Sequence, residues 1–100
     1  MSTETNAVKQ AVQDRIQAQI MTAQSKLEML KVKAEAAKAI AEVKAISDLL
    51  SKKRALDEKL SALKATSGDS RWEQAKADVE SRVADLEKSV QAIESKFKAA

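Results

Sequence analysis

The sequence predicts an all-α fold, an antiparallel coiled-coil hairpin with one long and one shorter helix. Three observations lead to it: the 100-residue chain has no proline, its only glycine is Gly68, and apolar residues recur at heptad spacing on both sides of that glycine. Proline and glycine are the residues that a helix interior tolerates least. The long helix is therefore expected over about 5–65 and the shorter one over about 71–99, together forming a single domain of residues 1–100.

The turn between the two helices is expected at residues 66–70. Gly68 can adopt the left-handed conformation that closes a helix C-terminus. Ser70 and Glu73 then have the spacing of a capping box, in which each side chain accepts a hydrogen bond from the backbone N–H of the other residue. These signals indicate a tight reversal and two antiparallel helices.

The seam of the hairpin is predicted from apolar residues spaced alternately three and four apart on both helices. An antiparallel pair centred on the turn sets Leu56 opposite Val83 and Leu49 opposite Val90. Lysines at two seam positions are expected to lay their stems along the seam and keep their ammonium groups in water, or to specify the register of the pair. The predicted seam residues are Ile46, Leu49, Leu56, Leu60, Leu63, Trp72, Val79, Val83, Leu86, Val90, Ile93 and Phe97, with lysines at 53 and 76.

Residues 39–100 complete this hairpin, so residues 5–38 are expected to project from it as an arm. The arm carries apolar residues of its own, and helices in proteins are stabilised mainly by burying such a face. We expect a second copy of the chain to bury it, giving a homodimeric helical bundle with two-fold symmetry. The alternative is that the arm folds back as a third helix near residues 22–25. The residues predicted to mediate self-association are Leu27, Met29, Leu30, Val32, Ile40, Val43 and Leu50.

The composition argues against catalysis. The chain has no histidine, cysteine or tyrosine, and this removes the commonest acid–base groups, the thiol nucleophiles and most zinc sites. It also has no glycine-rich loop that could hold a phosphate. We therefore predict no enzymatic activity, no catalytic, cofactor-binding or metal-ligating residue, and no cofactor.

The sequence gives two indications of location. No apolar run approaches the roughly 20 residues that a helix needs to cross a bilayer. The N-terminal segment lacks the basic and apolar regions of a signal peptide. A cytoplasmic protein is therefore expected.

The function that this pattern favours is structural: a scaffold, adaptor or assembly protein that acts through helix–helix contacts with itself or with another helical protein. Two alternatives stay open. Amphipathic, alanine-rich stripes would also suit a lipid or granule surface. The stretch 26–54 has eight lysines or arginines against four acids and could meet nucleic acid, although no aromatic residue interleaves it for base stacking. Regular heptads favour protein partners over a lipid surface.

Overall fold

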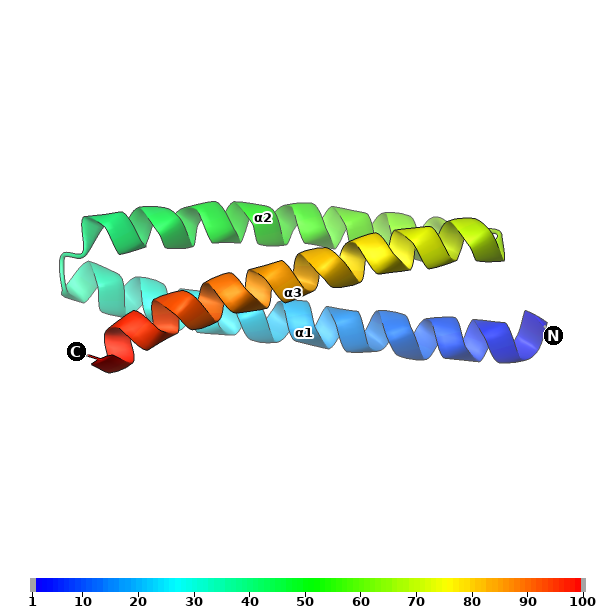
Figure 1. Ribbon diagram of the computed structural model, residues 1–100, viewed down its shortest axis with the longest axis horizontal. Helices are drawn as coiled ribbons and strands as arrows, with labels where there is room; N and C mark the ends of the chain where they lie inside the picture. The colour runs from blue at the N-terminus through cyan, green and yellow to red at the C-terminus, as the bar shows by residue number, and fades with distance from the viewer. Residues whose placement is uncertain (1, 100) are drawn as a thin grey trace.

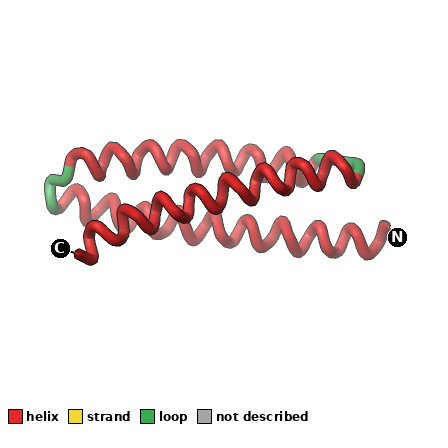
Figure 2. Tube along the Cα trace, viewed as in Figure 1, coloured by secondary structure: helices red, strands yellow, loops and turns green. Residues whose placement is uncertain are grey.

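The computed structural model describes residues 2–99, with side chains from residue 7 to residue 97, so the first and last residues of the predicted domain lie outside the described part. Within it the fold is all-α, as predicted. The three helices are α1 (Ser2–Ala36), α2 (Ile40–Ala65) and α3 (Asp69–Ala99) (Figure 1). Short turns join them at the two ends of the molecule (Figure 2).

The helices form an up-down-up bundle about 54 Å long and 18 by 15 Å across. Helix α2 runs antiparallel to both of its neighbours, and α1 and α3 run in the same direction. In Figure 1, α3 begins beside the C-terminal end of α2 and crosses the bundle obliquely. It ends beside the C-terminal end of α1. Each helix packs against the other two, so a single core runs along the axis of the rod.

Two expectations about the N-terminal half of the chain are wrong. The continuous helix expected over about 5–65 is interrupted at residues 37–39. Residues 5–38 do not project as an arm, because α1 packs against both other helices. The alternative, that the arm folds back as a third helix, agrees with the structure, but the reversal lies at residues 37–39 and not near residues 22–25, which α1 passes through without a break.

The turn that ends α1 is closed by backbone groups alone. The N–H of Ala39 donates to the carbonyl of Ala34 at 2.9 Å, and the N–H of Lys38 donates to the carbonyl of Glu35 at 3.1 Å. These two bonds make a Schellman motif, whose penultimate position requires a left-handed residue and is usually glycine. Lys38 takes that position with a φ of 56°. Because lysine and not glycine takes the left-handed position, the sequence contains no residue that would predict this turn.

The turn between α2 and α3 contains the glycine that the sequence marks. Gly68 has a φ of 90°, and the N–H of Trp72 donates to its carbonyl at 3.0 Å. Helix α3 therefore begins at Asp69, earlier than expected, and Ser70 lies inside its first turn. The hydrogen bonds of the described residues include no capping box between Ser70 and Glu73.

The core combines the predicted hairpin seam with the inner face of α1. Every apolar seam residue is buried except Phe97, which is half-buried and packs against the others. The seam lysines, Lys53 and Lys76, are half-buried. Helix α1 adds six buried residues to the same cluster: Ile16, Ile20, Ala23, Leu27, Leu30 and Ala34. The sequence places these residues in the segment expected to project as an arm. Their burial against α2 and α3 is the reason that the segment folds back onto the hairpin.

Ion pairs between α2 and α3 lie close to the register predicted for the hairpin. That register sets Lys59 opposite Glu80 and Glu42 opposite Phe97. Lys59 instead pairs with Asp78 at 3.7 Å, and Glu42 pairs with Lys96 at 3.7 Å. Each partner is one or two residues from the predicted position, which is within the reach of these long side chains.

Replacing Lys38 with glycine should stabilise the bundle. The left-handed conformation costs an L-residue roughly 1–2 kcal/mol and costs glycine almost nothing, while glycine adds some entropy to the unfolded chain. We expect a net gain of about 1 kcal/mol in the free energy of unfolding, measured by urea titration followed by circular dichroism. Ala84→Gly, at an exposed position inside α3, is the control and should lose about 1 kcal/mol. A loss in both variants would contradict the turn.

Leu27→Ala should cost about 2–4 kcal/mol, because the side chain is fully buried between α1 and the hairpin and truncation leaves a cavity. Met29→Ala, two residues away on the exposed side of the same helix, should change stability by less than about 0.5 kcal/mol. Urea titrations of both variants would check this. Equal costs would mean that α1 does not pack as described.

Candidate interaction surface

The residues predicted to mediate self-association divide into three groups in the structure. Two lie in the core of the bundle, Leu27 and Leu30. Val43 and Leu50 are half-buried beside it. The remaining three are exposed: Met29, Val32 and Ile40, with 62%, 66% and 83% of their surface accessible. Sequence spacing places all seven on apolar stripes and does not show which stripe the chain itself covers.

The outer face of α1 carries several exposed apolar residues, with the polar residues Asp14 and Ser25 among them. Met21, with 59% of its surface accessible, joins Met29 and Val32 there. Exposed alanines lie between and beyond these three residues. The spacings between these apolar residues are mostly close to two, three or five whole helical turns, so the residues lie on one side of α1. We call this set the α1 outer stripe: Ala11, Ala18, Met21, Met29, Val32 and Ala36.

The side of the stripe that faces α3 is basic. Arg15 pairs with Glu80 of α3 at 3.0 Å, which fixes that side. Lys26 and Lys33 lie about three and five helical turns from Arg15, and therefore on the same side of α1. Both lysines line a small hollow with Glu94 of α3. Cations of α1 therefore follow this border of the stripe, and Glu80, Glu87 and Glu94 of α3 lie beside them.

The side that faces α2 is acidic and amide-rich. Gln17 fixes it, because its side-chain oxygen accepts a hydrogen bond from the ammonium group of Lys64 at 3.2 Å. Glu28 and Glu35 lie about three and five turns from Gln17, on the same side. Lys31 lies deeper on this side and is half-buried. Among the residues of α1 itself, basic side chains therefore border the stripe on the α3 side and acidic ones on the α2 side.

Trp72 closes one end of the core and is held between two lysines. Only 2% of its surface is accessible, and the ammonium groups of Lys9 and Lys76 lie 5.3 and 5.8 Å from the ring centroid. Lys9 also pairs with Asp69 at 3.1 Å. The indole N–H has no hydrogen-bond partner among the described residues. The sequence places Trp72 at the hairpin tip, and the structure adds the contact with α1.

Removing the Lys9 side chain should destabilise the bundle by about 1 kcal/mol, because the variant loses a cation–π contact and an ion pair between α1 and α3. Lys9→Ala is compared with Asp69→Asn, which removes only the ion pair and should cost less. Trp72 is the only tryptophan, so its fluorescence in urea reports the transition. Equal losses in the two variants would mean that the cation–π contact contributes nothing.

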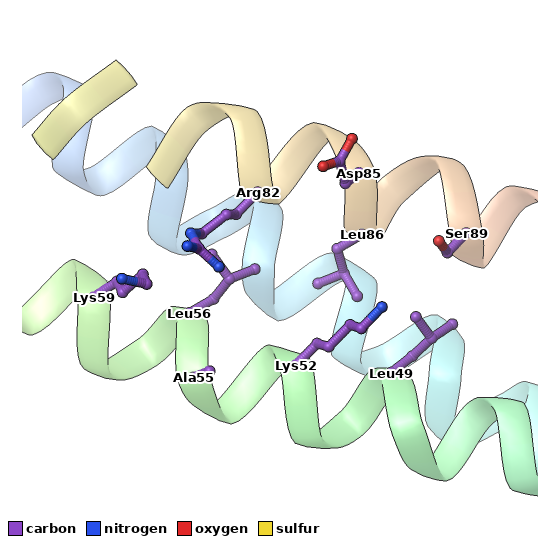
Figure 3. A pocket seen from close by; sticks show the side chains of 9 residues that line it. All are labelled: Leu49, Lys52, Ala55, Leu56, Lys59, Arg82, Asp85, Leu86 and Ser89. Carbon is purple, nitrogen blue, oxygen red and sulfur yellow. The ribbon is translucent and has the colours of Figure 1, made fainter. Parts of the chain in front are cut away.

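A groove of about 200 Å³ lies between α2 and α3 (Figure 3). Leu49, Leu56 and Leu86 form its floor. Charged side chains stand at its rim, where Lys59 and Arg82 both pair with an aspartate outside the groove, Asp78. The three leucines are already buried in the core, so a bound molecule would gain little new apolar contact. The groove does not carry a functional assignment.

The turn at 37–39 divides the basic stretch 26–54 between α1 and α2, and Lys53 is paired with Asp57 at 2.6 Å. Among the described residues no group of side chains is suited to hold a metal ion. The described helices also include none long and apolar enough to cross a membrane.

Comparisons with known proteins do not add to this description. No known protein family, curated protein or solved structure matches the chain. The packing of the chain itself leaves exposed the α1 outer stripe and, outside it, Val8 and Ile40.

Proposed function

We propose that this chain is a non-enzymatic assembly protein that acts through helix–helix contacts, and that it associates with a second copy of itself through the α1 outer stripe. The exposure of Met21, Met29 and Val32 on one helix face carries the proposal. A single exposed apolar side chain is ordinary on a protein surface. Three of them in line, with alanines that let another backbone approach, form a surface suited to a second helix.

The charges that border the stripe favour a parallel pair. When two copies face each other with their helices parallel, the α2 side of one stripe lies beside the α3 side of the other. Glu28 and Glu35 of one copy then meet Lys26 and Lys33 of its partner. In an antiparallel pair the two acidic borders would meet each other, and so would the two basic borders. Opposite charges attract and like charges repel across such borders, so they select the parallel arrangement.

This interface is small, and its strength is expected to be modest. Three large apolar side chains supply the anchors, and each exposed ion pair adds only about 0.2–1 kcal/mol. We therefore expect dissociation constants on the order of micromolar or weaker, as for transient assemblies. An assembly protein that must form and release its contacts can work in this range.

The stripe can be tested by placing a charge in its centre. In protein that has not been unfolded and refolded, Met21→Lys together with Val32→Glu should leave the fold intact and abolish association through the stripe, because both side chains are exposed in the single chain and buried in the pair. Sedimentation equilibrium over a range of concentrations measures the result. Ser81→Lys with Ala84→Glu places the same charges on the exposed face of α3 and should leave association unchanged. Equal behaviour of the two double variants would overturn the assignment.

The direction of the pair can be tested by reversing charges. Glu28→Lys and Lys33→Glu should each weaken a parallel pair several-fold, and combining them should restore association, because opposite charges again face each other. Sedimentation of the three variants gives the comparison. An antiparallel pair would respond differently, since Glu28→Lys would then face an acidic border and strengthen the contact.

A lipid or granule surface is the second candidate, because the apolar stripe lies beside Lys26 and Lys33 in the arrangement of an interfacial helix. Flotation with anionic vesicles separates the two candidates. Wild-type protein that floats at low salt, together with a Met21→Lys, Val32→Glu variant that does not, would favour the lipid surface. Protein that remains with the soluble fraction while dimerising would favour the assembly role.

A further inference from the structure

We infer that the turn between α1 and α2 is a hinge, and that α1 can leave its own chain and pack in the same place on a second copy. In the exchanged dimer α1 and α2 of each chain would join into one helix. The inference uses the buried inner face of α1 and the turn, not the α1 outer stripe, so it stands apart from the proposed function.

The sequence of the turn favours a helix. Residues 37–39 are two alanines and a lysine, which are among the strongest helix formers. The turn has no glycine or proline, and Lys38 occupies the left-handed region with a φ of 56°. Ala39 stands at the cap position of α2 and makes no side-chain cap bond. Straightening the chain here would relieve the left-handed conformation and give carbonyl partners to those N–H groups at the start of α2 that have none.

Exchange would preserve the contacts of α1. In the single chain α1 runs antiparallel to α2, and the hinge joins the C-terminal end of α1 to the N-terminal end of α2. Two chains with straightened hinges, related by a two-fold axis near Lys38, place each α1 in the site that the other has vacated. The inner face of α1 is then buried to the same extent, against α2 and α3 of the partner and not of its own chain. Such exchange of an identical element is a low-cost route to a dimer.

Ion pairs divide into two classes under this exchange. Lys9 with Asp69 and Arg15 with Glu80 join α1 to α3, so they would form between chains. Lys59 with Asp78 and Glu42 with Lys96 join α2 to α3, so they would stay within one chain. The α2–α3 pairs therefore serve as an internal control for the α1–α3 pairs.

Isotope labelling tests the inference on the full-length chain. Unlabelled and ¹⁵N-labelled protein are unfolded together in urea, refolded together at high concentration and treated with a carbodiimide, which condenses a paired lysine and carboxylate into an amide with loss of water. After proteolysis, mass spectrometry reads whether each cross-link is isotopically pure or mixed. We expect mixed Lys9–Asp69 products from the dimer fraction and pure Glu42–Lys96 products from the same sample. Pure products at both positions would overturn the exchange.

The length of the dimer gives an independent measurement that does not need the cross-link to form. A continuous helix over residues 2–65 would span about 95 Å at 1.5 Å per residue, against 54 Å for the longest dimension of the single chain. Small-angle scattering of the dimer fraction should show the longer particle. A dimer that stays near the length of one bundle, or a chain that remains monomeric after joint refolding, would overturn the inference. A short dimer with pure cross-links would leave the α1 outer stripe as its interface.

Substitutions at the hinge should shift the balance in opposite directions. Lys38→Gly accommodates the turn and should weaken the exchanged dimer about tenfold or more, since two hinges per dimer are affected. Lys38→Val penalises the left-handed conformation further and should favour the dimer. Ala84→Gly, away from the hinge, weakens the helix equally in both states and should leave the ratio unchanged. A Lys38→Gly protein that exchanges as readily as wild type would contradict the hinge.

Discussion

The fold depends on the burial of the inner face of α1 against the α2–α3 hairpin. Ile16, Ile20, Leu27 and Leu30 leave water when α1 folds back, and full burial of each such side chain is worth roughly 1.5–3 kcal/mol. The left-handed Lys38 costs roughly 1–2 kcal/mol. Burial therefore exceeds the local cost of the turn several-fold, and the chain reverses at a place where its backbone preferences favour a straight helix.

This balance also explains which parts of the fold the sequence predicts. The hairpin is marked by local signals that agree with each other, since Gly68 stands between two runs of seam residues. The α1–α2 turn has no such signal, because a Schellman motif is made of backbone bonds and Lys38 occupies its glycine position. Tertiary packing decides that turn. Helical propensity alone predicts the continuous helix that is not observed.

The candidate surface follows from the same ambiguity. Before folding, Leu27 and Met29 both lie on apolar stripes of one helix, and spacing does not rank one above the other. When α1 packs on the hairpin, the stripe that contains Leu27 is buried and the stripe that contains Met29 stays exposed. The sequence therefore predicts that two stripes exist and leaves open which of them the chain itself covers. The charged borders of the exposed stripe become recognisable only when the positions of α2 and α3 are known.

The two faces of α1 would give the chain two distinct ways to meet its own copy. The outer stripe would pair chains about an axis parallel to the bundle, whereas exchange of the inner face would pair them about an axis perpendicular to it. Each contact alone closes at a dimer. Acting together, they close at a tetramer if the two axes intersect, and otherwise they continue into an open array. Because exchange would remove the turn at Lys38 and leave Met21, Met29 and Val32 exposed, neither of the two proposed contacts would block the other. Both proposed modes of assembly would then depend on the same helix.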